Sequence, residues 1–458
     1  MNPNFLLIQL DQLSIRALQN IDAIPNINSL LDSGTSFETC TCQFPLCQPS
    51  RASLWSGMYP HKTDVLSNDR LWPNPEFPTS NKTLGEMFSD NGYTTVHFGK
   101  KHDKGTLRGF ECADFVTKYI PDDNPAFPFN KDTYHDVATE EQATMFLSQY
   151  NFEKPLVMAV DFVNPHNICG YVGLNNGEHE NAPYFPLPEL PENFDFDDIH
   201  NRSKSIQYIC CSHNRQAQTS RWKDEDFRYY LAAYYYYLSF VDTQVGNLIK
   251  ALEETGKKEE TIIVFFSDHG DGMASRRSVT KQVALYEELV SVPLAFSGYN
   301  IPRQTIQGLA ANLDIAPTLC ELAGIVIPST FDGISLADNI LNSKTVIRKY
   351  VSSQWHTEWG YTVSPSRMIR TQRYKYINYK EDDFEELYDL IEDPYEKTNI
   401  AKSFPEVLHD MQLLFKEYLI SSKDPFMSLE ADVDAKWRNH KLGYCNHYGI
   451  AAPQEVRK

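Results

Sequence analysis

The segment Thr261–Asp271 reads TIIVFFSDHGD, an uninterrupted apolar run followed at once by polar and charged residues. A short run rich in β-branched and aromatic residues is typical of a parallel strand that is buried on both faces. Three further runs have the same form, at Asn4–Leu10, Tyr93–Phe98 and Pro155–Phe162. Each run leads into residues that can carry chemistry, and in parallel sheets ligands bind at the carboxyl ends of the strands. The runs therefore predict both a sheet and the edge at which a site would form.

Helical patterns separate these runs. They cover Ile24–Ser33, Lys82–Asn91, Thr139–Gln149 and Asp224–Thr255. Strands that alternate with helices indicate an α/β fold with helices on both faces of the sheet. We therefore predict a large doubly wound mixed sheet flanked by helices.

The pattern changes after Ile340. Short strand patterns at Val351–Ser353, Arg367–Arg370, Tyr374–Tyr379 and Glu386–Leu390 are followed by a helical pattern at Pro405–Ser421. We predict a catalytic domain over residues 1–345 and a smaller C-terminal α+β subdomain with an antiparallel sheet over residues 346–458. The segment Cys169–Asp226, rich in Pro, Asn, Asp and Glu, is expected to be a surface insertion near the site.

Composition excludes several classes of protein. The chain has 458 residues, of which 41% are hydrophobic and 22% charged, as in a globular protein. Its 42 basic and 61 acidic residues give a net charge of −19, which argues against a phosphate-binding surface for nucleic acid or anionic lipid. No apolar run approaches the roughly 18 residues that span a bilayer, so we expect no membrane partner.

Cysteine usage and the start of the chain bear on the cellular compartment. Nine cysteines are an odd number spread thinly over the chain, which favours reduced thiols. No signal-peptide pattern follows Met1. We expect a cytoplasmic protein if this start is native, and a periplasmic or secreted one if a leader has been removed.

The segment Pro45–Gly57, PLCQPSRASLWSG, carries the most specific pattern in the chain. Pro49 suits the first turn of a helix, which would place Cys47 at the positive helix end. Arg51 then lies one turn along on the same face, where its guanidinium can reach an anion formed at position 47. The alternative is a buried structural cysteine before an ordinary helix.

This segment resembles the signature C-x-P-S-R-A-S-L-x-[TS]-G of the type I, formylglycine-dependent sulfatases of the alkaline phosphatase superfamily. The resemblance implies that Cys47 is oxidised to formylglycine by a partner, a formylglycine-generating enzyme or a radical maturase. The hydrated aldehyde would attack sulfur with one oxygen and expel sulfate with the other.

Two strand ends resemble the metal motifs of this family. The segment Pro3–Gln12 looks like a first strand that ends in two carboxylates, except that Gln12 replaces the second one and removes a negative charge. The segment Phe265–Asp271 resembles the second metal motif. The resemblance implies a site for Ca²⁺, or for Mg²⁺, made of Asp11, Gln12, Cys47, Asp268 and His269.

The remaining motifs imply the catalytic residues. Gly92–His102 resembles G-Y-x-T…G-K-W-H, with Lys101 in place of the usual tryptophan. In this resemblance Lys100 neutralises the sulfate oxygens and His102 accepts the proton of the second hydroxyl. His166 would stand near the leaving oxygen as general acid, although a loop histidine is the alternative. Lys281, ahead of Tyr286-Glu287-Glu288, would bind sulfate.

Residues beyond the sulfate group would choose the substrate. The candidates are Arg70, Arg276, Arg277, His356 and Trp359. Arg276 and Arg277 could hold a second anionic group or lie in a solvated loop. The resemblance implies hydrolysis of the O-sulfate of a saccharide, including one derived from a glycosaminoglycan. The alternatives are a phosphonate monoester or phosphodiester hydrolase of the same superfamily, and a non-catalytic protein that binds sulfated carbohydrate.

Overall fold

The computed structural model describes residues 2–19, 23–68, 76–114, 133–174, 187–195, 202–203, 206, 219, 222–281, 284–346, 348–356, 365–380, 384–429, 444–445 and 450–451. Arg70 and Trp359, two of the expected substrate-binding residues, lie outside these ranges. Most of the expected insertion Cys169–Asp226 lies outside them as well.

Eight strands of the described part of the chain form one mixed sheet. They are β1 (Asn4–Asp11), β2 (Thr35–Thr41), β3 (Thr94–Gly99), β4 (Glu111–Cys112), β5 (Leu156–Pro165), β6 (Thr261–Ser267), β7 (Leu294–Gly298) and β8 (Gln304–Ala311). Their order is β4-β3-β5-β1-β6-β7-β2-β8. Only β7 runs antiparallel to its neighbours β6 and β2. The four runs that the sequence predicted, β3, β5, β1 and β6, are consecutive in this order and mutually parallel.

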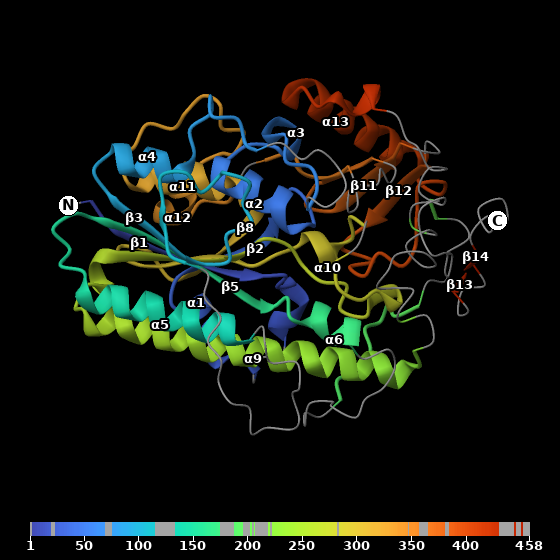
Figure 1. Cartoon of the computed structure of the whole chain (residues 1–458). Coiled ribbons are helices and arrows are strands. Elements are labelled where there is room, and N and C mark those ends of the chain that lie inside the picture. The colour runs from blue at the N-terminus through green and yellow to red at the C-terminus, as the bar shows by residue number, and fades with distance from the viewer. Residues whose placement is uncertain are drawn as a thin grey trace.

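Helices cover both faces of this sheet (Figure 1). The α-helices of the described part of the chain are α1 (Pro25–Asp32), α2 (Cys47–Ser56), α3 (Pro60–Thr63), α4 (Leu84–Asp90), α5 (Thr133–Gln149), α6 (Ile168–Leu174), α9 (Asp224–Glu254), α10 (Glu287–Val290), α11 (Ile315–Leu322), α12 (Ala337–Asn342) and α13 (Pro405–Ser422). Short 3₁₀ helices span Ile15–Gln19, Lys258–Glu260, Ser275–Arg277, Asn312–Asp314 and Pro425–Ser428. The long helices α5 and α9 lie side by side on one face, and α2, α4 and α11 lie on the other.

The side chains of the central strand β1 pack into two hydrophobic cores, one on each face of the sheet. Every residue of β1 is buried, and its side chains alternate between the faces. Leu6 and Ile8 pack into the cluster that includes Leu238 of α9. Phe5 and Leu7 pack into the cluster that includes Trp55 of α2 and Phe88 of α4. Burial on both faces explains why the run is apolar without alternation.

A second, smaller sheet follows the first. Its strands are β9 (Val351–Trp355), β10 (Ser366–Arg370), β11 (Tyr374–Tyr379) and β12 (Phe384–Asp389), all antiparallel, in the order β12-β11-β10-β9. Helix α13 packs on it through Phe415 and Leu419 against Ile369, Tyr376 and Leu387. A separate pair, β13 (Tyr444–Cys445) and β14 (Ile450–Ala451), is also antiparallel.

The fold class predicted from the sequence is confirmed, both for the large mixed sheet and for the small antiparallel one. The boundary between residues 345 and 346 stays a prediction. Strands β2, β4, β7 and β8 were not predicted, because polar residues or glycine interrupt their apolar pattern. Strand β2, for example, reads TSFETCT, and Glu38 is exposed.

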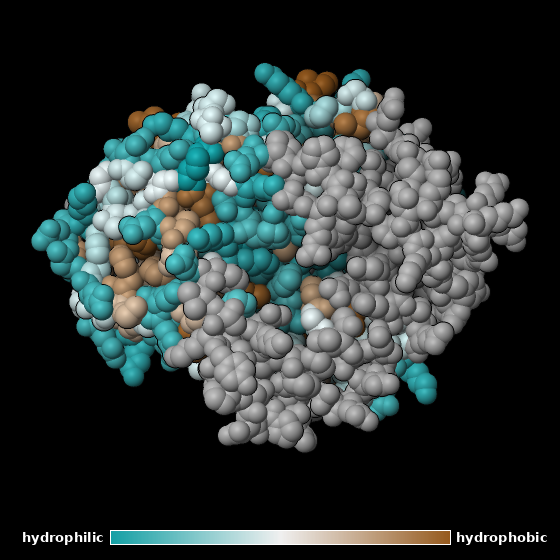
Figure 2. All heavy atoms as spheres, in the orientation of Figure 1, coloured by the Kyte–Doolittle hydropathy of each residue, from teal (hydrophilic) through white to brown (hydrophobic). Residues whose placement is uncertain are grey.

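Hydrophilic residues predominate among the coloured residues of the face in Figure 2, with smaller brown patches between them. Among the described residues, the helices lack the combined length and apolar composition that a bilayer span requires.

Candidate active site

The carboxyl ends of four adjacent parallel strands bring the predicted residues together. Asp11 ends β1, Lys100 follows β3, His166 follows β5 and Asp268 follows β6. Parallel neighbours end at the same edge of a sheet, so residues that are up to 257 positions apart in the chain meet there. The predicted convergence of the four strand ends is confirmed by the fold.

Helix α2 carries Cys47 into this edge. Cys47 is the first residue of the helix and Pro49 the third, as the pattern predicted. Every residue of α2 is buried, and Gly57 ends the helix in the left-handed conformation, with φ 65°, that favours glycine. Ser50 Oγ donates a hydrogen bond of 2.5 Å to the backbone oxygen of Asp268, which ties the helix to the end of β6.

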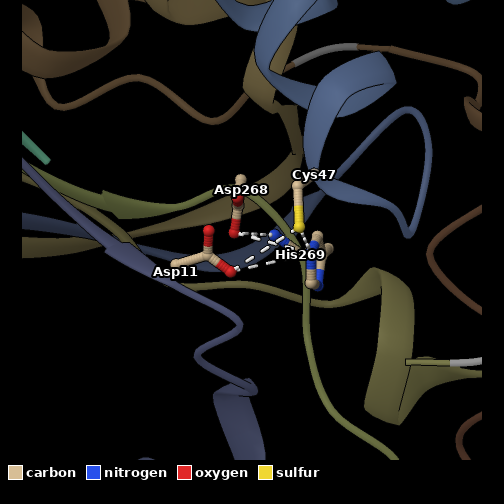
Figure 3. A group of neighbouring side chains, drawn as sticks. All are labelled: Asp11, Cys47, Asp268 and His269. Atoms are coloured by element: carbon tan, nitrogen blue, oxygen red, sulfur yellow. Dashed lines mark hydrogen bonds and ion pairs between the residues drawn. The ribbon is translucent and has the colours of Figure 1, made fainter. Parts of the chain in front are cut away.

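Four buried side chains converge beside the helix terminus (Figure 3). The side-chain ligand atoms of Asp11, Cys47, Asp268 and His269 all lie within 4.8 Å of one another. Cys47 Sγ lies 3.3 Å from His269 Nε2 and 3.8 Å from Asp11 Oδ1. Burial, with the Asp11 carboxylate beside it, raises the pKa of Asp268. Two buried carboxylates and an imidazole are ligands suited to a divalent cation, which would relieve this repulsion.

Gln12, the fifth predicted ligand, makes other contacts. Its Oε1 accepts a hydrogen bond of 2.8 Å from Lys281 Nζ, and its Nε2 donates one of 2.6 Å to Asp271 Oδ2. Asp271 in turn accepts hydrogen bonds from the hydroxyl of Tyr230 and from the backbone N–H of Met273. The side chain of Gln12 therefore links Lys281 to a buried acid, and its role as a metal ligand stays a prediction.

Arg51 lies among three carboxylates. Its Nε donates to Asp268 Oδ2 at 3.0 Å, Nη1 to Asp161 Oδ2 at 2.9 Å and Nη2 to Asp11 Oδ2 at 3.1 Å. All four side chains are completely buried. The sequence predicted Arg51 on the same helix face as Cys47, and the structure shows the guanidinium holding the carboxylates around it.

Two lysines make the site electropositive. Lys100 Nζ lies 2.5 Å from Asp11 Oδ2 and 3.9 Å from Cys47 Sγ. Burial opposes the charge of Lys281, but Cys47, Cys169 and Asp11 more than offset it and hold the pKa of Lys281 above its usual value. Burial alone would also raise the pKa of the Cys47 thiol, yet Lys100, Lys281 and His269 hold it well below its usual value. Position 47 is therefore a place where negative charge is stabilised.

Two histidines face the same position. His102 contributes to the lowered pKa of Cys47, and Cys47 in turn favours the charged form of His166. Burial, followed by the charges of Lys100 and Lys281, lowers the pKa of His166 to about 4, so this imidazole is neutral at pH 7 before substrate binds. His166 can donate a proton as a general acid only once an anionic substrate has offset the two lysines.

The expected substrate-binding arginines are engaged elsewhere. Arg276 is 2% exposed, forms an ion pair of 2.5 Å with Glu288 and stacks on the Tyr286 ring. Arg277 forms ion pairs with Asp195 and Asp224. These contacts disfavour the expectation that the two arginines hold a second anion. His356 is largely buried, and this burial together with Arg367 lowers its pKa to about 4.

Sequence reasoning missed two buried residues that belong to the site. Asp161 lies within β5 and contacts Arg51, and His97 lies within β3 and contacts Asp161 through Nε2 at 3.1 Å. Burial opposes the charge of His97, but Asp161 overcomes it and raises the pKa of His97 to about 9. The available signal was a charged residue in the middle of an otherwise apolar strand, because such a residue needs a buried partner.

Comparison with known families assigns the chain. The Sulfatase family model matches residues 3–325, and the model for the C-terminal part of N-sulphoglucosamine sulphohydrolase matches residues 279–421. The chain belongs to the sulfatase family. Enzymes of this family generally work with a metal ion and a formylglycine.

Two named relatives define the comparison further. The chain is 44% identical to the Delta 4,5-hexuronate-2-O-sulfatase of Bacteroides thetaiotaomicron, over 100% of this chain and 97% of that one. It is 27% identical to arylsulfatase K of Rattus norvegicus, over 89% of this chain and 76% of that one. Relatives of this kind make the chain an enzyme, a sulfatase, as the sequence predicted.

Solved structures agree. A structure described as a 2-O GAG sulfatase superposes with a TM-score of 0.92 at 44% identity, covering 99% of both chains. A phosphonate monoester hydrolase of Agrobacterium radiobacter shares the fold alone, with a TM-score of 0.73 at 20% identity over 93% of this chain and 96% of that one. The family relationship therefore favours sulfatase over both alternatives considered from the sequence.

Proposed function

We propose that this sulfatase removes the 2-O-sulfate of a Δ4,5-unsaturated hexuronate in a saccharide derived from a glycosaminoglycan. The observation that carries this proposal is the 44% identity to a Delta 4,5-hexuronate-2-O-sulfatase across the whole chain. A sugar with a double bond between C4 and C5 has no oxygen at C4 through which a chain could continue, so it is terminal. The proposed activity is therefore an exo activity.

The proposed cofactors are Ca²⁺ and a formylglycine made from Cys47 by a maturase. Asp11, Asp268 and His269 would hold the cation together with an oxygen at position 47, where the present thiol stands for the precursor. The cation would polarise the sulfate ester, and the hydrated aldehyde would supply the nucleophile. Gln12 would add a neutral ligand.

The surrounding residues would bind the sulfate and manage protons. Lys100 and Lys281 flank position 47 with positive charge, which suits a sulfate ester. His102 favours negative charge at position 47 and would take the proton of the hydroxyl that remains after sulfur is attacked. His166 and Lys281 are the candidate proton donors to the leaving sugar oxygen.

The His166→Ala variant should distinguish substrates by their leaving groups. A sugar alkoxide needs a proton as the S–O bond breaks, so kcat on the saccharide sulfate should fall by about 10²–10⁴-fold, the usual worth of general acid catalysis. An aryl sulfate leaves as a stabilised phenolate, so its kcat should change little. Steady-state kinetics with both substrates provide the measurement. Arg51→Ala serves as the contrasting variant and should damage both rates alike, whereas an equal loss with His166→Ala would show that His166 binds the sulfate group instead.

Substrate choice is tested with a panel of position-defined disaccharides. It contains the 2-O-sulfated unsaturated hexuronate disaccharide, its saturated counterpart, and disaccharides sulfated at O6 or N2 of the glucosamine. The first compound should have the highest kcat/KM, since the proposal concerns that ring and that position. A higher kcat/KM for a glucosamine sulfate would contradict the substrate assignment.

A further inference from the structure

Asp161 and Gln9 occupy the same register position on the adjacent strands β5 and β1. Both are completely buried in strands that are otherwise mainly apolar. In the amide orientation that satisfies its hydrogen bonds, Gln9 Oε1 accepts from Arg51 Nη2 at 2.8 Å and from Nη1 at 3.2 Å. Asp161 Oδ2 accepts from Nη1 at 2.9 Å. The two central strands therefore form a polar seat for one end of the Arg51 guanidinium.

The three carboxylates around Arg51 are of two kinds. Asp11 and Asp268 belong to the cluster that would hold the cation, whereas Asp161 lies outside it. Asp161 is fixed from its other side by His97, whose Nε2 lies 3.1 Å from the same oxygen. Asp161 Oδ2 thus lies within hydrogen-bond distance of both Arg51 and His97.

The position of Asp161 beside Arg51 but outside the cation cluster gives it its significance. A divalent cation would neutralise the charges of Asp11 and Asp268, and these two acids would then cease to be effective counter-ions for Arg51. An uncompensated guanidinium is costly in a fully buried place. Without Asp161, the Arg51 guanidinium would also compete with the cation for the carboxylates of Asp11 and Asp268.

We propose that Asp161, held by His97, is a positioning residue that remains the counter-ion of Arg51 when the cation is bound. It keeps the guanidinium aligned with Asp11 and Asp268 without drawing these carboxylates away from the metal. The inference rests on the metal site of the proposed function. Asp161 acts through Arg51 and touches none of the reacting atoms.

The Asp161→Asn variant, which preserves side-chain volume and removes the charge, should bind Ca²⁺ about tenfold more weakly, as is usual when a partner outside the ligand shell is lost. Calorimetric titration of the metal-free protein with Ca²⁺ measures this directly, without reference to activity. In the Ca²⁺-saturated enzyme kcat should fall on saccharide and aryl sulfates alike while KM changes little, because Arg51 acts on the group at position 47. Rates are normalised to the formylglycine content found by mass spectrometry.

The matched control is Asp242→Asn. Asp242 is another buried aspartate, and it accepts hydrogen bonds from the backbone N–H groups of Asn26 and Ile27, away from the strand ends. Its substitution should leave the Ca²⁺ affinity and kcat unchanged even if the melting temperature falls. His97→Gln, which keeps the carboxylate but alters its support, should weaken Ca²⁺ binding in the same direction by a smaller factor, and it carries the test if Asp161→Asn does not fold.

The Ca²⁺ titrations test the metal site and the role of Asp161 separately. If the unsubstituted protein binds no Ca²⁺, the proposed metal site is wrong. If it binds Ca²⁺ and the substituted proteins bind it equally well with unchanged kcat, the role of Asp161 is wrong while the metal site stands.

Discussion

Replacing Cys47 with alanine should abolish sulfate release. Cys47 lies at the terminus of helix α2, and its Sγ contacts Lys100, His269 and Asp11. Alanine can be neither oxidised to the aldehyde nor hydrated to a diol, so the nucleophile disappears. Removing the nucleophile of a hydrolase costs on the order of 10⁶-fold in kcat, and we expect a loss of this size, measured as released inorganic sulfate.

A second buried thiol provides the control. Cys320 is completely buried in α11, away from the strand ends, so Cys320→Ala should lose some stability and keep its kcat. Mass spectrometry of the peptide that contains residue 47 should show the formylglycine mass in this control and in the parent protein. Turnover by Cys47→Ala at the parent rate would contradict the assignment of the nucleophile.

Disrupting the metal site, by substitution of Asp268 or by chelation, is expected to cause the second largest loss of kcat. Asp268→Ala deletes a buried carboxylate that both contacts Arg51 and belongs to the four-residue cluster. Without it, the proposed cation would lose one of its two carboxylate ligands, and Arg51 would lose a partner. We expect kcat to fall at least about 10³-fold, comparable to the loss of a principal electrostatic stabiliser of the transition state. Chelation of the parent enzyme should have a similar effect, and Ca²⁺ should restore its activity.

Gln12→Ala provides the graded comparison for this experiment. Gln12 would contribute a neutral oxygen to the cation, so its loss should weaken Ca²⁺ binding less than the loss of Asp268 does. Added Ca²⁺ should restore more activity to Gln12→Ala than to Asp268→Ala. A chelated enzyme with unchanged activity, or an Asp268→Ala enzyme as active as the parent, would refute the metal site.

The sequence predicted those strands that are buried on both faces, because their burial makes every residue of the run apolar or nearly so. Strand β6 coincides with the run Thr261–Ser267, since every residue of it is buried. The meeting of the strand ends was predicted because parallel neighbours end at the same edge of the sheet. The helix that begins at Cys47 was predicted from Pro49 in its first turn. Strands β2, β4, β7 and β8 were not predicted, because polar residues or glycine interrupt their apolar pattern and they pair with segments distant in the chain.

The contacts within the site were harder to predict than its members. The motifs placed Arg51 near position 47, but they did not show that three carboxylates surround it or that one of them is Asp161. The sequence left open whether Arg276 and Arg277 hold an anion or lie in a solvated loop, because their partners Glu288 and Asp195 are 12 and 82 positions away in the chain. Neutralisation by distant partners cannot be read from neighbouring residues.

The rate of sulfate release by preparations with different formylglycine contents tests the central claim most directly. The substrate is the 2-O-sulfated unsaturated hexuronate disaccharide, and the formylglycine fraction at position 47 is determined by mass spectrometry in each preparation. The initial rate should rise in proportion to this fraction and extrapolate to zero for unconverted Cys47. A rate independent of the fraction, or no release of sulfate by fully converted protein saturated with Ca²⁺, would contradict the account.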